Sequence, residues 1–137
     1  MTSKAFHLLP EHGISPTPQR VAIHDALQGR KDHPTVDKVF AELRESMPTL
    51  SKTTVYSTLQ LFAQHGLILA LHAEDGELRY DPTTHFHAHF KCRACGDLRD
   101  IELPGREKTA IAPLPRGFVP ETQELVYYGL CPHCSHA

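Results

Sequence analysis

The spacing of apolar positions divides the chain into a helical first half and a strand-like second half. Apolar residues recur every three or four positions over 36–47 and 55–62, which is typical of helices with one buried face. We therefore expect helices over 35–47 and 51–65, each opened by a Thr or Ser N-cap. Another helix is expected to begin at Thr17, where proline follows at an early helical position.

A β-hairpin is expected directly after these helices. Residues 67–72 are typical of a strand, Asp75-Gly76 is a typical hairpin turn, and residues 77–80 form the return strand. Three helices followed by a hairpin make a winged helix-turn-helix, in which helices 35–47 and 51–65 form the helix-turn-helix pair.

The remainder of the chain is predicted to be a second, smaller domain. The expected elements are strands over 86–92, 97–103 and 118–128, and a short helix over 105–112. The sequence thus predicts an α+β protein with a winged-helix domain over 1–82, a hinge at about 81–84, and a small α/β domain over 85–137. A unit of about 50 residues needs a metal, a disulfide or a partner chain to be stable.

Four cysteines supply that stabilisation. Cys92-x-x-Cys95 and Cys131-x-x-Cys134 are two knuckles of the kind that hold a tetrahedral zinc ion. We expect a structural Zn²⁺ here, with disulfides or redox chemistry as the alternatives. Four thiolates complete the coordination of zinc, so the site is expected to be inert toward substrates.

Histidines supply a second candidate metal site. The chain has 11 histidines, and three of them alternate with apolar residues as His85-Phe86-His87-Ala88-His89. On a strand the three imidazoles share one face. Nearby candidate carboxylates are Asp81, Asp97 and Asp100, so we expect a bound metal ion here.

One polar helix face is suited to DNA. Thr53, Tyr56, Ser57 and Gln60 form a stripe on helix 51–65 with Lys52 beside it, and such side chains can contact phosphates and base edges. The alternative is an ordinary solvated face. Net charge is only −2, but residues 1–66 hold seven Lys and Arg against six Asp and Glu, so only this half can offer a DNA surface. No apolar run approaches the roughly 20 residues of a membrane span, and no secretory signal begins the chain, so we expect a cytoplasmic protein.

Taken together, the motifs resemble the ferric uptake regulator (Fur) family of bacterial metal and peroxide-stress regulators. The matching pieces occur in family order: Thr17-Pro18-Gln19-Arg20, His33-Pro34-Thr35, Ser51-Lys52-Thr53-Thr54-Val55-Tyr56, Arg79-Tyr80-Asp81, His87-Ala88-His89 before Cys92-x-x-Cys95-Gly96, and Tyr128-Gly129 before Cys131. They cover nearly the whole chain from about residue 13.

The resemblance implies a regulatory metal between the two domains. Its ligands correspond to His33, Asp81, His87, His89 and Asp100, a set that suits Fe²⁺ or Mn²⁺, with Zn²⁺ as a third option. Aspartate in both carboxylate positions is typical of the peroxide-sensing (PerR) branch, where iron-uptake regulators tend to have glutamate. A further family site would need ligands at Phe86, Ala88, Glu107 and Gln123, and only Glu107 is suitable, so that site is expected to be absent.

The implied function is that of a homodimeric repressor, not an enzyme, which binds pseudo-palindromic operator DNA and no small-molecule substrate. Peroxide would oxidise His33 or His87, and the zinc cysteines would take no part in sensing. The expected DNA contacts are Arg20, Lys52, Thr53, Thr54, Tyr56, Ser57 and Gln60. Ser57 stands where the family often has arginine, which leaves the operator sequence open.

Three alternatives remain at this stage. Within the family, the chain could be an iron-, zinc- or manganese-uptake regulator without peroxide sensing. Outside it, His87-Ala88-His89 with two aspartates could form a metallohydrolase centre on a zinc-ribbon scaffold, although no separate general base is evident. The four cysteines could instead form a thiol-redox switch or holdase.

Overall fold

The chain folds into two units with their own internal contacts. The computed structural model describes residues 3–72, 76–85, 87–103, 114–121 and 123–136. Unit 1 comprises Met1–Thr84 and unit 2 comprises His85–Ala137. The fold is α+β, as the sequence predicted. Across the described residues, every helix is too short or too polar to traverse a bilayer.

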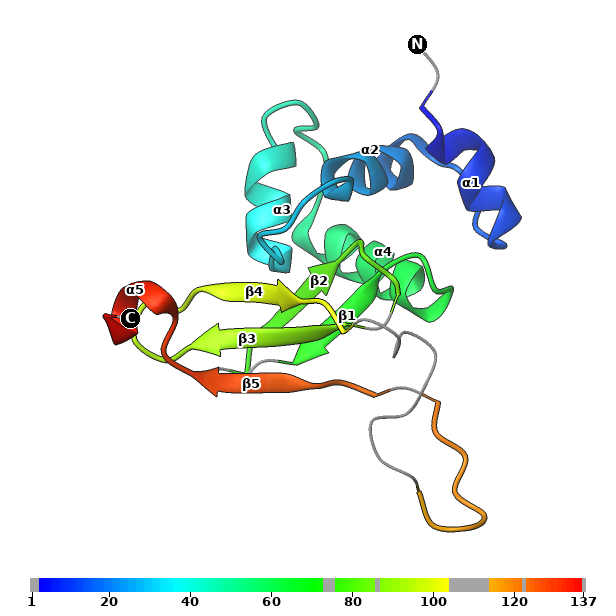
Figure 1. Ribbon diagram of the computed structural model, residues 1–137. Helices are drawn as coiled ribbons and strands as arrows, with labels where there is room; N and C mark the ends of the chain where they lie inside the picture. Colours follow the sequence, from blue (N-terminus) through cyan, green and yellow to red (C-terminus); the bar gives the residue numbers. More distant parts are fainter. Residues whose placement is uncertain (1–2, 73–75, 86, 104–113, 122, 137) are drawn as a thin grey trace. The chain divides into compact units, whose positions relative to one another are not determined.

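Unit 1 is a winged helix-turn-helix (Figure 1). Its elements are α1 (Ala5–Glu11), α2 (Pro18–Leu27), α3 (Val36–Leu43), α4 (Lys52–Gln64), β1 (Leu69–His72) and β2 (Leu78–Asp81). The two strands pair antiparallel as the wing. The prediction of three helices was one too few, because the short amphipathic start of the chain forms α1. The predicted hinge also began too early, since Asp81 is the last residue of β2.

The helix boundaries follow the capping residues. Thr17, Thr35 and Ser51 each accept a hydrogen bond from the backbone N–H three residues on, at 3.3, 3.2 and 3.0 Å, which confirms the N-caps predicted at Thr35 and Ser51. The predicted end of α3 at Met47 was wrong, because the helix stops at Leu43. Residues 44–46 form a turn, and Pro48 disfavours helical geometry at the residue before it.

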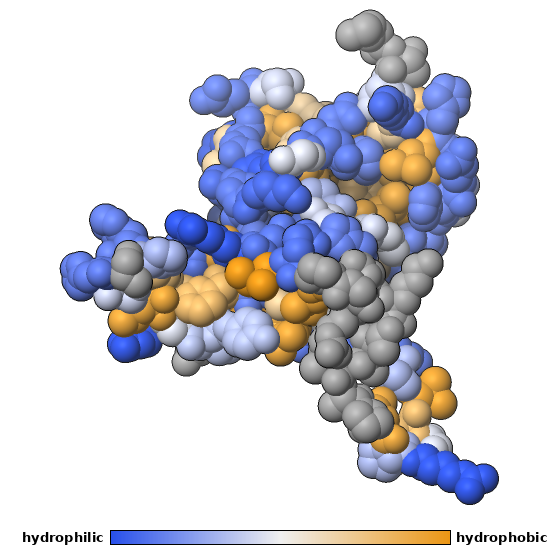
Figure 2. Space-filling view, in the orientation of Figure 1, coloured by the Kyte–Doolittle hydropathy of each residue, from blue (hydrophilic) through white to orange (hydrophobic). Residues whose placement is uncertain are grey.

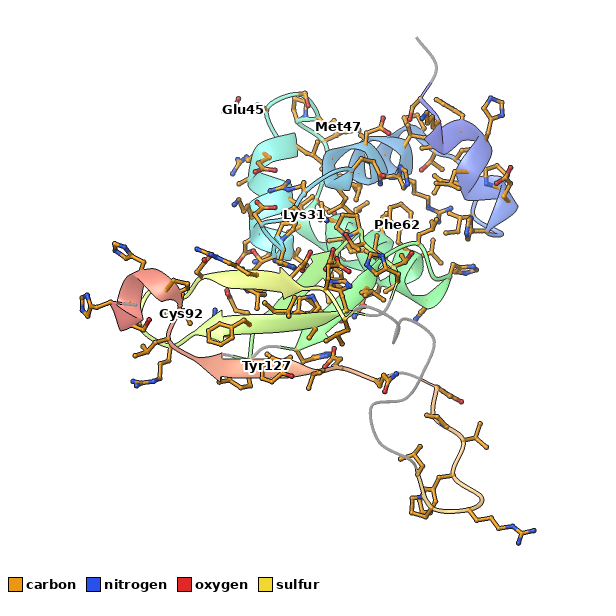
Figure 3. The ribbon with its side chains drawn as sticks, in the orientation of Figure 1. Lys31, Glu45, Met47, Phe62, Cys92 and Tyr127 are labelled. Carbon is orange, nitrogen blue, oxygen red and sulfur yellow. The ribbon has the colours of Figure 1, made fainter. Side chains whose placement is uncertain are left out.

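The main hydrophobic core lies in unit 1. Val55, Leu59 and Phe62 are completely buried, as the helical spacing predicted, and Phe62 is labelled on α4 in Figure 3. They pack with Ala5 and Leu9 of α1, residues of α2 and α3, and the wing. Burial of this face fixes α4 in the unit and leaves its opposite face to solvent.

One buried polar residue escaped the sequence analysis. His24 of α2 is 4% exposed and packs edge-on against Phe62, with ring centroids 6.0 Å apart. Its Nε2 lies 3.2 Å from Nε2 of Gln28. Burial lowers the pKa of His24, and Asp25 opposes this only in part.

The stability of unit 1 should therefore fall in mild acid. Because the folded-state pKa of His24 is lowered, the unfolded chain takes up a proton first as pH drops below about 6.5, and the folded state is disfavoured from there down. We expect His24→Gln to lose less stability than wild type between pH 7.5 and 5.5. Urea unfolding, monitored by amide hydrogen exchange of α2 and α4, measures the stability of both proteins at each pH. Equal losses of stability in wild type and His24→Gln would contradict the lowered pKa of His24.

Unit 2 is a small three-stranded sheet. Strands β3 (Ala88–Cys92), β4 (Leu98–Ile101) and β5 (Val126–Gly129) lie in the order β4-β3-β5, and helix α5 (Pro132–Ser135) follows. β3 pairs antiparallel with β4 and parallel with β5 (Figure 1).

The predicted strands of unit 2 were too long. The largest error is 118–128, where, among the residues that the structure describes, the strand begins only at Val126. Pro120 has no backbone N–H to donate to a neighbouring strand, and it lies before β5, outside the paired residues. The predicted helix over 105–112 falls outside the described residues.

Candidate functional site

The four cysteines converge at one end of the sheet of unit 2. Cys92 ends β3, where Figure 3 labels it, and a turn closed by the Gly96 N–H to Cys92 C=O bond (2.9 Å) brings Cys95 back. Cys131 is the N-cap of α5, and Cys134 lies one turn into that helix. Gly96 has φ of 80°, a conformation that glycine adopts without strain.

The geometry of this cluster fits a tetrahedral metal ion. The four Sγ atoms lie within 4.8 Å of one another, and the Cys95–Cys131 pair is 3.9 Å apart. Zn–S bonds of about 2.3 Å place tetrahedral sulfurs about 3.8 Å apart, whereas a disulfide needs about 2.05 Å. All four thiols are free, so the disulfide alternative is not supported.

The sulfur atoms are also electronically prepared for a cation. Backbone N–H groups of Cys95 and Cys131 lower the pKa of Cys92 to about 6. The Cys131 N–H donates to the Sγ of Cys92 at 3.4 Å. Side-chain hydrogen bonds of the Cys134 thiol with Cys131 and Cys92 raise its pKa to about 12. Four thiolates this close are stable only with a positive ion among them.

A first histidine half-site lies across β3 and β4. His89 and Asp100 are directly opposite each other in the antiparallel register, so their side chains share one face. Asp100 Oδ1 lies 3.3 Å from Nε2 of His89 and 3.2 Å from Nε2 of His87. His87 and His89 are buried, with imidazole centroids 4.5 Å apart. The sheet thus brings three ligand atoms together.

The tautomer of His87 favours a cation at this half-site. His87 Nδ1 donates to the His85 carbonyl at 2.7 Å, so in the neutral ring Nε2 carries a lone pair. That lone pair faces a carboxylate oxygen, an arrangement stabilised by a proton or a metal ion between them. The donor set therefore fits a metal.

His33 and Asp81 form a second half-site, in unit 1. His33 lies in the loop between α2 and α3, Asp81 ends β2, and both side chains are buried. His33 Nε2 and Asp81 Oδ2 are 3.4 Å apart. The other carboxylate oxygen, Oδ1, accepts a 2.9 Å bond from the Thr83 N–H, which fixes the carboxylate orientation. Two of the predicted ligands are thus adjacent within unit 1.

Ion pairs hold the loop that carries His33. Arg30 binds Asp32 at 2.7 Å and Glu42 of α3 at 2.6 Å, and Lys38 binds Asp32 at 2.8 Å. The hydrogen bond to Asp32 is the main cause of the raised pKa of Arg30, and the same bond holds the pKa of Asp32 well below its usual range.

The predicted DNA face of α4 is exposed. Thr53, Tyr56 and Ser57 are exposed, while Thr54 and Gln60 are half-buried. Gln60 Nε2 donates to the Tyr56 hydroxyl at 3.0 Å, which leaves the Tyr56 O–H able to donate outward. A groove of about 570 Å³ runs beside this face, with Arg20 of α2 among its lining residues. Lys52 is paired with Asp37 of α3.

His85 and Asp97 do not belong to the histidine half-site. The Nε2 of His85 lies 3.0 Å from Glu102, at the surface, and Asp97 binds Arg99 at 2.5 Å. The ring centroid of His85 lies 5.3 Å from that of His87, so the three imidazoles are neighbours, but only those of His87 and His89 face Asp100.

Comparison with known proteins decides the family. The model of the ferric uptake regulator family matches residues 11–128. The chain belongs to this family. It is 35% identical to the peroxide operon regulator of Bacillus subtilis over 133 residues, which is 96% of this chain and 92% of that protein. It is 33% identical to the peroxide-responsive repressor PerR of Staphylococcus aureus over 127 residues, covering 92% and 86%.

The fold agrees with solved members of the family. The Helicobacter pylori ferric uptake regulator matches with a TM-score of 0.72 over 96% of this chain and 89% of that chain, at 19% identity. Members of the ferric uptake regulator family are dimeric, metal-binding transcription regulators that bind DNA, not enzymes. The metallohydrolase alternative is therefore set aside.

Proposed function

We propose that the chain is a peroxide-sensing, metal-dependent transcriptional repressor. Support comes from the buried His87–His89–Asp100 half-site together with the identity to two peroxide-responsive regulators. Both carboxylates of the half-sites are aspartates, the pattern of the peroxide-sensing branch. A repressor acts where chromosomal DNA is, so we assign it to the cytoplasm.

We propose that the four-cysteine cluster holds a structural Zn²⁺ and that the two half-sites share one regulatory Fe²⁺ or Mn²⁺. Two ligands in unit 1 and three in unit 2 are each too few for such an ion, whereas five nitrogen and oxygen ligands suit Fe²⁺ or Mn²⁺. Because both units contribute ligands, binding of the regulatory metal would favour one arrangement of the two units. The DNA affinity then rises only if the metal favours the DNA-competent arrangement.

Unit 1 is proposed to read DNA with α4, and unit 2 to form the homodimer. No residue of α4 is acidic, so DNA phosphates can approach its exposed face. β5 lies at the sheet edge with Tyr127 and Tyr128 about half exposed, and apolar surface is visible on unit 2 in Figure 2. Dimer symmetry then places two α4 helices on half-sites of a pseudo-palindromic operator.

The ligand histidines are the proposed targets of oxidation. A bound Fe²⁺ would supply the redox chemistry that activates peroxide beside these imidazoles. One peroxide oxygen is added to a ring carbon of His33 or His87 and the other leaves as water, so the protein gains one oxygen atom. Oxidation weakens that ligand, and the DNA-competent arrangement is no longer stabilised.

Anaerobic loading with Fe²⁺ tests the proposal. The protein, with an operator selected from random-sequence double-stranded DNA, is exposed to micromolar peroxide while DNA binding, intact mass and zinc content are followed. We expect loss of binding, a one-oxygen gain on His33 or His87, and retained zinc. The Mn²⁺-loaded protein is the control and should keep its binding. If DNA binding survives without oxygen addition in the Fe²⁺ form, a metal-uptake regulator is the better assignment.

A further inference from the structure

The backbone at His33 is unusual for the residue it carries. His33 has φ of 50°, in the left-handed region that residues other than glycine seldom adopt. Such a conformation persists only where neighbouring contacts hold it. The ion pairs of Arg30 fix the residues before His33, and a further contact is needed to hold His33 itself.

Arg79 of β2 supplies that contact. Its Nη1 donates to the carbonyl oxygen of His33 at 3.2 Å, and its Nη2 donates to Glu77 at 3.1 Å. The same strand binds the next two loop residues. The Tyr80 N–H donates to the Pro34 carbonyl at 3.0 Å, and Thr35 forms a β-bridge with Arg79. The loop is thus joined to β2 by backbone pairing, and the side chain of Arg79 adds a hydrogen bond to the carbonyl of His33.

This attachment determines how the two ligands of unit 1 meet. Asp81 lies two residues after Arg79 on β2, so the strand that holds the His33 backbone also carries the second ligand. With the carbonyl of His33 held, its imidazole Nε2 reaches to 3.4 Å from the Asp81 carboxylate. Movement of the His33 carbonyl would rotate the peptide and carry the imidazole away from Asp81.

We propose that Arg79 is a positioning residue for the regulatory metal: its guanidinium holds the backbone of the ligand His33 in the conformation that brings His33 beside Asp81. The inference rests on the proposed function, since it takes His33 as a ligand. Arginine is needed because one planar fork binds the His33 carbonyl and Glu77 at the same time, and a lysine ammonium cannot reproduce that fork.

Manganese binding to the full, zinc-loaded chain tests the role. We expect Arg79→Gln to weaken Mn²⁺ binding by about 10- to 100-fold, the usual effect of removing a group that orients a metal ligand. Arg79→Lys should weaken it by less. Glu77→Gln is the matched control, because the glutamine amide oxygen can still accept from Arg79 Nη2 and the bond to His33 is left, so its Mn²⁺ affinity should stay near wild type. Zinc content and the thermal midpoint without Mn²⁺ report on folding.

A double-mutant cycle separates positioning from general stability. His33→Asn removes the imidazole while tolerating the left-handed backbone. If Arg79 acts through His33, adding Arg79→Gln to His33→Asn should cause no further loss of Mn²⁺ affinity. Equal losses in both backgrounds, or wild-type affinity in Arg79→Gln, would overturn the role of Arg79. Undiminished Mn²⁺ affinity in His33→Asn itself would instead overturn the ligand assignment, and with it the proposed regulatory site. If Arg79→Gln loses its zinc, the same double-mutant cycle is measured with Arg79→Lys in its place.

Discussion

Replacing Cys92 by serine should release the zinc and unfold unit 2 while unit 1 remains folded. Among the described residues, the buried apolar side chains of unit 2 are few: Ala88, Cys92, Leu98 and Cys131, two of which are the cluster's own cysteines. So small a core cannot offset the entropy of ordering the chain. Zinc binding worth about 10–16 kcal/mol would supply most of the folding free energy of this unit.

Amide hydrogen exchange and zinc content measure this effect. In Cys92→Ser, the amides of β3, β4 and β5 should lose protection, whereas those of α2 and α4 should keep it because the main core lies in unit 1. His133→Ala is the matched control, since His133 lies between two of the cysteines and is exposed. A Cys92→Ser protein that keeps one zinc per chain and a protected sheet would show that the cluster is not the structural centre.

Replacing His87 by alanine should abolish metal-dependent operator binding and leave the zinc in place. The variant removes the imidazole whose Nε2 lies 3.2 Å from Asp100, and loss of one ligand of five lowers the affinity for the regulatory metal. DNA binding with saturating Mn²⁺ should fall to the level of the wild-type protein without it. If metal shifts the DNA-competent arrangement of the units from about 1% to about 99% of the population, the apparent operator affinity rises by about 100-fold.

His85→Ala is the control for that experiment. The imidazole of His85 pairs with Glu102 and not with Asp100, while its carbonyl, which accepts from His87 Nδ1, is retained in alanine. Operator titrations with and without Mn²⁺ should therefore give near wild-type values for His85→Ala. Tight operator binding by His87→Ala in the absence of the second metal would refute the model of metal-dependent repression.

The helices and the cysteine cluster were predictable because their signals are local. The N-caps Thr17, Thr35 and Ser51 and the buried face of α4 depend on contacts within a few residues, and the two Cys-x-x-Cys motifs act as short turns. Strand ends were less accurate. The start of β3 at Ala88 depends on what pairs beside it, which the sequence does not encode locally.

The interior polar contacts were not predictable from spacing. His24 lies on a helix face that reads as part of an ordinary amphipathic pattern, and only packing against Phe62 reveals its burial. The same holds for Arg79, which appeared only as one letter of a motif. Its bond to His33 joins residues 46 positions apart, and such a contact depends on how β2 meets the loop before α3.

The sequence by itself determined the fold class and the cysteine cluster, because residue types and short spacings specify capping and knuckle turns. The resemblance to the ferric uptake regulator family added the set of candidate ligands for the regulatory metal. Only the tertiary structure decided which ligands are neighbours within each unit. The antiparallel register sets His89 opposite Asp100, and the attachment of β2 to the loop at residues 33–35 brings His33 to Asp81. Both outcomes depend on strand pairing between distant segments, whose register is set by packing of the whole unit and not by local sequence.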